Sequence, residues 1–380
     1  MSQLKVNAIS DSAGANGNAI TLATDGTCTT KATNKVAHNF LYNGEMMINQ
    51  RGDQTTVNGY GGPDRWKTQV SQGAFTASKD SESPPGFNSS LKLDCTTAAA
   101  LTANNSIKVV QHLEGQDLQG FAAGTASAKS LTLSFWVRSN KTGVFNAHIY
   151  QKDGGKLVSQ NTTISSANTW EKKTFTVAGN TGNTIDNDNS KSLTIEFWLD
   201  SGPDNKGGTI TDSWAASASN KYGQGITLNI GDHLDNVFYL TGVQLELGDF
   251  ASDFSYRSYG DELQRCLRYF WMIKGDNYDK PGISTFANNA STCRAQVKFP
   301  VPMRAAPTFT GSSTGMMHDS SNDSATFDIS DFVLSSGNIT TEANPSGCTI
   351  EVSTSSMDAG AAGDLEFKEN GGSMQFIAEL

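Results

Sequence analysis

Strict alternation of apolar and polar residues marks the middle of the chain. Between residues 131 and 247, three segments alternate with a period of two, the pattern of strands buried on one face. The positions in phase are Leu131, Leu133, Phe135 and Val137; Leu193, Ile195, Phe197 and Leu199; and Val237, Tyr239, Thr241, Val243, Leu245 and Leu247. Turn-forming clusters separate them, with no helical periodicity between. The pattern predicts an all-β protein whose first globular domain is a jelly-roll β-sandwich.

One segment departs from this period. Leu263, Cys266, Leu267 and Phe270 recur with the i, i+3, i+4, i+7 spacing of one helical face. Ser258 suits an N-cap, and the carboxylates of Asp261 and Glu262 fall in the first turn, where the helix dipole favours them. We therefore expect a helix of about three turns within residues 258–274, linking two β domains.

The two ends of the chain differ from the middle. Residues 1–37 are small, polar and turn-forming, and we expect them to become ordered only by strand pairing with another chain, as an attachment arm. Residues 275–380 alternate weakly, with Pro300 and Pro302 at a strand end or edge. The predicted domains are thus the arm (1–37), the jelly roll (38–257), the linking helix (258–274) and a second, smaller β-sandwich (275–380).

Composition narrows the class of protein. The chain is rich in glycine and only 17% of its 380 residues are charged, as in loop-rich extracellular β proteins. Its net charge of −10 includes no basic stripe along the sequence, which argues against nucleic-acid binding. No apolar run approaches 18 residues, so we expect no membrane insertion. The five cysteines are scattered without a CxxC pair, which fits free thiols and synthesis in a reducing cytoplasm.

Several blocks of the sequence are similar to virion structural proteins. They are LYNGEMMINQRG (41–52), GGPDRW (61–66), LTLSFWVRSNKTG (131–143), NTWEKKTFTVAGNT (168–181), VKFPVPMRAAPTF (297–309) and the closing IAEL (377–380). The most specific is YLTGVQLELGDFASDFSYRSYGDELQRCLRYF (239–270), which resembles the family pattern VQLE.G..ATPFE.R....EL..CQRYY. It departs from that pattern at Ser252-Asp253-Phe254 and at Leu267. The chain thus resembles the phage tail-fibre family of cyanophages and other marine phages, whose first domain is like a carbohydrate-binding module.

The resemblance implies a subunit of a phage particle, made in the host cytoplasm and located in the tail or another external appendage. It also implies a homotrimer that docks on other particle proteins through residues 1–37 and attaches to the host surface by glycan recognition. A head-decorating fibre, baseplate or tail-assembly protein without a ligand remains an open alternative. A glycan-degrading tailspike is a third, although the parallel β-helix repeats usual there are not evident.

No catalytic motif supports an enzyme. The five histidines lack HExxH spacing, and neither a GxSxG elbow nor a phosphate-binding GxxxxGK[ST] occurs. Acids such as Asp232, Asp235 and Glu246 read more simply as solvated loop residues and an outward strand residue than as a glycosidase pair. We expect no catalytic residue.

Aspartates in two turns are the candidate metal ligands. Asp186 and Asp188 lie in TIDNDNS, and Asp232 and Asp235 lie in GDHLDN, with carboxylate oxygens of the kind that Ca²⁺ prefers. Aspartate is also common in turns for local hydrogen bonding. A structural Ca²⁺ is therefore one interpretation, and no other cofactor is expected.

Tryptophans supply the candidate glycan contacts. Trp136 and Trp198 fall on the polar phase of LTLSFWVRS and LTIEFWLDS, so neighbouring strands would place both indoles on one face where a sugar could stack. The alternative is that this face packs against a second subunit or sheet. For the trimer, the candidate contacts are Leu263, Leu267, Phe270 and Trp271.

Overall fold

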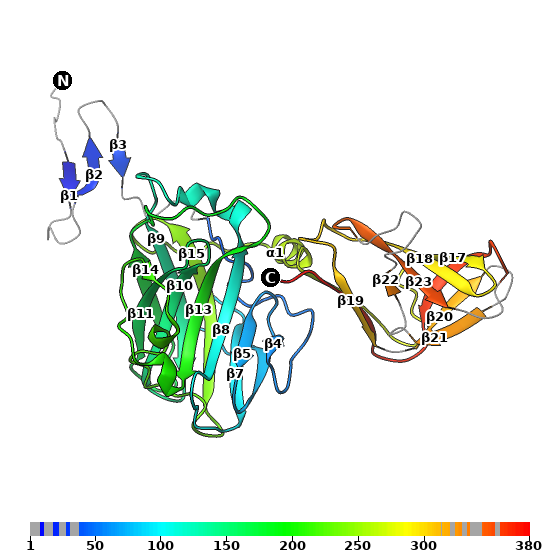
Figure 1. The fold of residues 1–380 in the computed structure, drawn as a ribbon, viewed down its shortest axis with the longest axis horizontal. Helices are drawn as coiled ribbons and strands as arrows, with labels where there is room; N and C mark the ends of the chain where they lie inside the picture. The colour runs from blue at the N-terminus through cyan, green and yellow to red at the C-terminus, as the bar shows by residue number, and fades with distance from the viewer. Residues whose placement is uncertain are drawn as a thin grey trace.

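The computed structural model describes residues 8–10, 18–22, 28–30, 38–312, 314–319, 324–328, 333–334, 344–353 and 358–380. The fold is all-β, with a larger jelly-roll sandwich followed by a short helix and a smaller sandwich (Figure 1). This confirms the predicted fold class. In the described part of the chain, no helix has the length and apolarity needed to cross a membrane.

Two antiparallel sheets make the jelly roll. The first, here called the β8–β13 sheet, has the strand order β14-β11-β10-β13-β8-β5-β4. Its strands are β4 (Gly59–Tyr60), β5 (Lys67–Val70), β8 (Ser106–Glu114), β10 (Gly143–Gln151), β11 (Lys156–Ile164), β13 (Lys191–Ser201) and β14 (Ala215–Ala216). The second, the β9–β15 sheet, has the order β12-β9-β15-β7-β6. Its strands are β6 (Ala74–Asp80), β7 (Ser90–Thr97), β9 (Leu131–Ser139), β12 (Glu171–Val177) and β15 (Val237–Leu247).

The core lies between these sheets. The predicted alternating segments are strands β9, β13 and β15. Their apolar phase points inward along β9 and β13 and at Val243 and Leu245 of β15. Before the register shift at Gly242, the core residues of β15 are Phe238 and Leu240, because the shift reverses the phase that the sequence predicted there. Phe135 of β9 and Phe197 of β13 meet edge to face across the sandwich, with ring centroids 4.8 Å apart. Short 3₁₀ turns cap the loops: η1 (Gly115–Phe121), η2 (Pro203–Asn205) and η3 (Ser219–Lys221). Alternation therefore predicted the three strands and their buried faces, except in the first half of β15.

The helix is shorter than expected. α1 spans Tyr259–Leu267, and Ser258 caps it as predicted by accepting a hydrogen bond from the Asp261 amide. Residues 270–274, assigned above to the helix, instead belong to strand β16 (Phe270–Gly275), which pairs with β25 (Gly372–Ile377). The prediction was wrong here because the aromatic and aliphatic run from Phe270 to Ile273 favours a strand once a partner strand is available.

The residues after the helix form the second sandwich. One sheet has the order β16-β25-β19 and the other β21-β20-β24-β17-β18-β23-β22. The remaining bounds are β17 (Ser284–Asn289), β18 (Thr292–Lys298), β19 (Thr308–Ser312), β20 (Thr314–Asp319), β21 (Ser324–Asp328), β22 (Val333–Leu334), β23 (Gly347–Ser353) and β24 (Ala362–Phe367). Pro300 and Pro302 follow the end of β18, as expected of proline. A separate core that includes Phe299, Phe367 and Phe376 fills this domain.

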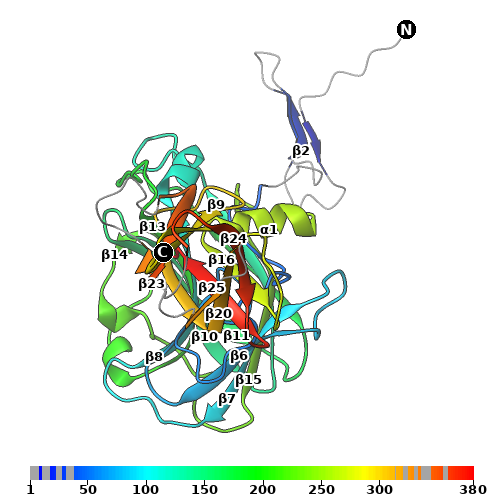
Figure 2. The ribbon, with the colours of Figure 1, turned by 90° about the vertical axis from the view of Figure 1, so that its right-hand side faces the viewer.

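Three short strands of the N-terminal segment pair with one another. β1 (Ala8–Ser10), β2 (Asn18–Leu22) and β3 (Cys28–Thr30) form an antiparallel sheet beside the jelly roll (Figures 1 and 2). The expectation that this segment orders only by pairing with another chain is wrong for these residues, because the chain supplies its own partner strands. The rest of the 1–37 arm lies outside the described residues.

Candidate functional site

The outer face of the β9–β15 sheet carries an aromatic patch. Its members are Phe87, Trp136, Phe254 and Tyr256. Trp136 and Phe87 both lie against Gly242, since a Cβ there would stand 2.9 Å from Trp136 Cδ1 and 2.7 Å from Phe87 Cζ. The Phe87 ring meets Phe254 at 5.1 Å and Tyr256 at 5.6 Å. Tyr256 is 55% exposed, so the patch reaches the surface.

Trp198 lies on the other sheet and is covered. It is on β13, with only 4% of its surface exposed. Tyr222 stacks on its ring with centroids 5.1 Å apart and planes 19° apart, and Lys108 Nζ lies 4.4 Å from the ring centroid. The indole Nε1 donates to Glu196 Oε2 at 2.6 Å. Tyr222, which is half-buried, is the more accessible ring of this stack.

The predicted sugar platform of Trp136 with Trp198 is therefore wrong. β9 and β13 belong to opposite sheets, so the two side chains point away from each other on the two outer faces. LTLSFWVRS and LTIEFWLDS are similar because both strands alternate buried and outward residues. The similarity does not mean that the two strands are neighbours in one sheet. Trp136 is half-buried at the surface, whereas the ring of Trp198 is covered by Tyr222 and Lys108.

A loop segment is fastened onto the outer face of the β8–β13 sheet next to Trp198. The fully buried His148 places Nε2 3.0 Å from the Tyr222 carbonyl and Nδ1 2.6 Å from Ser159 Oγ. Asn146 Nδ2 donates to the same Tyr222 carbonyl at 2.9 Å. Burial lowers the pKa of His148 to about 4. A neutral imidazole therefore holds the 203–226 segment in place.

Beside this loop the sheet presents what we call the polar face. Strand alternation places its outward residues side by side on β5, β8 and β13, namely Lys67, Lys108, Val110, His112, Thr194 and Glu196. Glu196 is 8%, His112 6% and Thr194 1% exposed. Outward-facing residues of a strand are ordinarily exposed to solvent. Such low exposure of polar side chains is therefore unusual. Burial lowers the pKa of His112 to about 2, which keeps it uncharged.

The far end of the polar face is closed by a charged joint. The Glu114 carboxylate is fully buried and receives two hydrogen bonds from Arg268, at 2.8 and 2.7 Å. Tyr269 donates its hydroxyl to the same carboxylate at 2.5 Å. Bidentate arginine pairs of this kind fix geometry strongly. The segment after α1 is thereby held against the end of β8.

Sequence reasoning missed a second part of this joint. Glu379 accepts from Arg65, whose side chain is fully buried, and from Arg51 at 3.2 Å. The Arg65 guanidinium also lies 3.4 Å from the ring centroid of Tyr269. The three motifs GGPDRW, RYF and IAEL thus meet in one cluster. The three motifs occur together in the sequence, which was the one available signal for this cluster. Their order along the chain does not show that they are in contact.

A cavity of about 730 Å³ lies beside the joint. Its walls come from the jelly roll, from α1 and from the loop at Val301 and Pro302, and they include Tyr42, Gln116, Asp117, Arg257, Asp261, Gln264, Arg265 and Arg268. The charges are largely engaged within the chain: Arg257 pairs with Glu262, and Asp117 accepts from Tyr42. The cavity is large enough for a small ligand, and its lining combines three arginines with two aspartates.

The four candidate metal ligands lie in turns, where two of them are bonded through their carboxylates and two through their backbone. Asp188 accepts from the Ser190 amide at 2.9 Å, a local turn bond, and the Asp186 amide donates to Asp153. Asp232 pairs with Lys141 and also accepts from Asn236, while the Asp235 carbonyl accepts from Asn140. Among the described residues no three or more His, Cys, Asp or Glu side chains are grouped as metal ligands. The Ca²⁺ suggestion stays a prediction.

The predicted trimer contacts separate into two kinds. Phe270 is 1% exposed and lies beneath Arg51, whose guanidinium is 3.5 Å from its ring centroid. Trp271 stacks on Phe376 at 5.2 Å. The aromatic surface attributed to another subunit is thus used within the chain, which corrects the expectation for Phe270. Leu263 and Leu267 are half-buried on α1, and their role in a trimer stays a prediction.

Comparison with known proteins gives likenesses of fold only. No protein family and no curated protein matches the sequence. Among solved structures, a putative sugar binding protein from Bacteroides thetaiotaomicron is similar at a TM-score of 0.34 and 12% identity, over 56% of this chain and 100% of that one. TmCBM61, solved in complex with β-1,4-galactotriose, gives 0.28 and 11% over 56% of this chain and 99% of that one.

The tailspike protein 4 enzymatically active domain of bacteriophage CBA120 is also similar, at a TM-score of 0.31 and 13% identity. The match covers 55% of this chain and about a fifth (21%) of the tailspike chain. At these scores the likenesses do not bear on what the present chain binds.

Proposed function

We propose that this chain is a non-enzymatic, fibre-type subunit of a bacteriophage particle, and that it attaches the particle to the host surface by binding a glycan. The resemblance of the 239–270 block supports the virion assignment, and the polar face of the β8–β13 sheet supports the glycan. In this proposal the subunit is a homotrimer whose residues 1–37 dock on other particle proteins. Linked copies would raise the effective concentration of sites that are weak one by one.

The shelter of the polar face is the observation that carries the glycan assignment. A sugar needs hydrogen-bond donors and acceptors placed side by side, together with an aromatic ring for its C–H face. Glu196 and Lys108 supply a hydrogen-bond acceptor and a donor on adjacent strands. Tyr222 supplies a half-buried ring that Trp198 supports from behind. Residues held in place by packing bind with a smaller loss of side-chain entropy.

The aromatic patch favours a second function. Phe87, Trp136, Phe254 and Tyr256 offer apolar rings but few polar groups, which suits contact with another protein of the particle better than contact with a sugar. A purely structural head, baseplate or tail component would use this patch and leave the polar face without a ligand. The two functions therefore predict different sensitive residues.

The test compares Tyr222→Ala with the matched variant Tyr256→Ala on the opposite outer face. Purified full-length protein is titrated with host surface polysaccharide, and its ability to block phage adsorption is measured. Since one aromatic contact with a sugar is worth on the order of 1.5 kcal/mol, Tyr222→Ala is expected to weaken binding about tenfold and Tyr256→Ala to leave it unchanged. If the wild-type protein neither binds the polysaccharide nor blocks adsorption, the glycan-binding proposal is wrong and the purely structural role is favoured. Release of reducing sugar would refute the non-enzymatic assignment.

A further inference from the structure

Four lysines from separate parts of the chain come together on the polar face. Lys67 lies on β5, Lys108 on β8 and Lys191 on β13, and these strands are neighbours in the sheet. In the strand register Lys67 stands opposite Val110 and Lys191 opposite Glu114. Lys152 joins them, because its amide donates to the Ser192 carbonyl at 2.8 Å beside Lys191. The chain order hides this cluster completely.

These cations are poorly compensated by the protein. Two nearby carboxylates are already engaged: Glu196 lies 3.6 Å from Lys108 Nζ, and Glu114 accepts from Arg268. Within the described part of the chain, Lys67, Lys152 and Lys191 have no carboxylate within 4.0 Å. Burial, and then the charges of Lys152 and Lys67, lower the pKa of Lys191. In a protein of net charge −10, mutually repelling lysines on a sheltered face are unfavourable without an anionic partner.

The length of the array indicates the kind of anion. Lys108 and the register position of Lys191, opposite Glu114, are six residues apart along β8, or about 20 Å. One compact anion cannot contact cations spread over such a distance, whereas a polymer with regularly spaced charges can. Lysines on flexible stems also suit point charges such as carboxylate or sulfate better than a rigid bidentate geometry.

The polar groups between the lysines separate a polysaccharide from a nucleic acid. Glu196, whose side chain is 11% exposed, offers carboxylate oxygens at the centre of the array. Sugar hydroxyls can donate to them, whereas the phosphates of duplex DNA are acceptors and would face the Glu196 carboxylate unfavourably. The half-buried Tyr222 at one end adds a ring on which a sugar can stack.

We propose that the polar face binds an acidic polysaccharide whose repeating unit carries carboxylate or sulfate groups, with Lys67, Lys108, Lys152 and Lys191 as its cationic contacts. This assignment rests on the proposed glycan-binding function and names its ligand class. Lys108 also orients Glu196 and covers Trp198, so its replacement is expected to disturb the face itself. Lys67 and Lys191 are the cleaner residues to change, since neither has a carboxylate partner.

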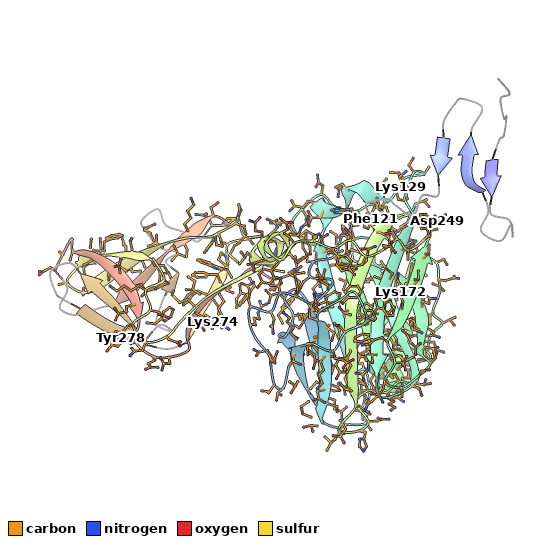
Figure 3. All side chains as sticks on the ribbon, turned by 180° about the vertical axis from the view of Figure 1, so that it is seen from behind. Phe121, Lys129, Lys172, Asp249, Lys274 and Tyr278 are labelled. Carbon is orange, nitrogen blue, oxygen red and sulfur yellow. The ribbon has the colours of Figure 1, made fainter. Side chains whose placement is uncertain are left out.

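The experiment uses the full-length double variant Lys67→Gln/Lys191→Gln. Its control is Lys92→Gln/Lys172→Gln, which removes the same charge from two lysines of the opposite β9–β15 sheet, on β7 and β12 (Lys172 is labelled in Figure 3). Three probes are titrated at about 50 and about 200 mM salt: a polyuronate, a neutral glucan of similar length and duplex DNA. We expect the wild-type protein to bind the polyuronate most tightly and to lose affinity with salt. The double variant should bind it at least about tenfold more weakly and with a smaller salt dependence, while the control variant should match the wild type.

The outcomes separate the two proposals. Equal binding of the neutral glucan and the polyuronate, unchanged in the double variant, would overturn the acidic ligand and leave glycan binding intact. If neither saccharide bound and host polysaccharide also failed, the proposed function itself would fail. Tighter binding of duplex DNA than of polyuronate, lost in the double variant, would reassign the lysines to nucleic acid. An equal loss in the control variant would show that net charge, not this face, determines binding.

Discussion

At the scale of single residues, the burial of His148 makes the free energy of unfolding depend on pH. It is buried and neutral in the folded protein, with a pKa near 4, whereas an unfolded histidine titrates near 6.5. Between these values the unfolded state binds the proton and the folded state does not, so stability falls as the pH is lowered from about 6.5 to about 4. The slope from this one group is at most about 1.4 kcal/mol per pH unit. We expect His148→Gln to show a shallower loss between pH 6.5 and 5, measured by denaturant unfolding at each pH.

A buried acid elsewhere in the jelly roll, Glu45, changes stability with pH in the opposite direction. Burial and the charge of Glu262 raise the pKa of Glu45 to about 7, so this carboxyl favours the folded state increasingly as the pH falls from about 7 to about 4.5. The prediction therefore concerns the difference between His148→Gln and the wild type, in which Glu45 cancels. Parallel curves for the two proteins would show that His148 does not titrate as its burial requires. The absolute stability of the variant is expected to be lower at every pH, because the imidazole also fastens the Tyr222 segment.

At the scale of elements, the irregularity in β15 depends on one glycine. The register of β15 against β9 shifts between Thr241 and Gln244, and Gly242 there has a φ of 59°. A side chain at this position would be strained and would collide with Phe87 and Trp136. Gly242→Ala should therefore destabilise the protein by about 2 kcal/mol or more, as judged by chemical unfolding. Gly260→Ala is the matched control, since Gly260 lies in α1 with open space around its Cα and alanine is the better helix former. A neutral Gly242→Ala would mean that the bulge and its rings rearrange freely.

The elements that the sequence predicted well are those with a strong period. β9 and β13 alternate over at least seven residues and their apolar side chains face the core between the two sheets, so local pattern and burial agree. In β15 they agree only after the register shift at Gly242. Residues 270–274 could not be assigned correctly from period alone. Leu263, Cys266, Leu267 and Phe270 continue a helical spacing, yet the partner strand β25 lies about 100 residues later in the chain. Long-range pairing decided the structure there, and single-sequence periodicity contains no information about it.

The same limit applies to the candidate site. Trp198 was recognised as an outward residue, but its neighbours Tyr222 and Lys108 come from a loop and from another strand. The sequence contains no basic stripe, yet the folded chain has a cluster of lysines. Strand pairing brings Lys67, Lys152 and Lys191 together from three distant segments. Residue chemistry was thus available from the sequence, whereas the arrangement of those residues required the fold.

At the scale of the whole molecule, Glu379 links the two sandwiches. It lies after β25, and its carboxylate accepts from Arg51 and Arg65 of the first domain. Arg304 strengthens the link by donating to the Ala378 and Glu379 carbonyls and to Asn189 of the jelly roll. Replacing Glu379 by alanine would leave the fully buried Arg65 guanidinium without its counter-charge, a loss of about 3–5 kcal/mol. We therefore expect Glu379→Ala to separate the unfolding of the two domains and to allow them to move relative to each other.

Differential scanning calorimetry and small-angle X-ray scattering together test this link. The variant should show two transitions where the wild type shows one, and a broader distribution of distances between the domains. Asp358→Ala, which removes an exposed acid of the same domain, should resemble the wild type in both measurements. A single transition and an unchanged scattering curve for Glu379→Ala would place the stability of the joint elsewhere, in the Glu114, Arg268 and Tyr269 cluster. Because that cluster also closes the end of the polar face, Glu379→Ala is expected to weaken polyuronate binding only if the two halves of the joint act together.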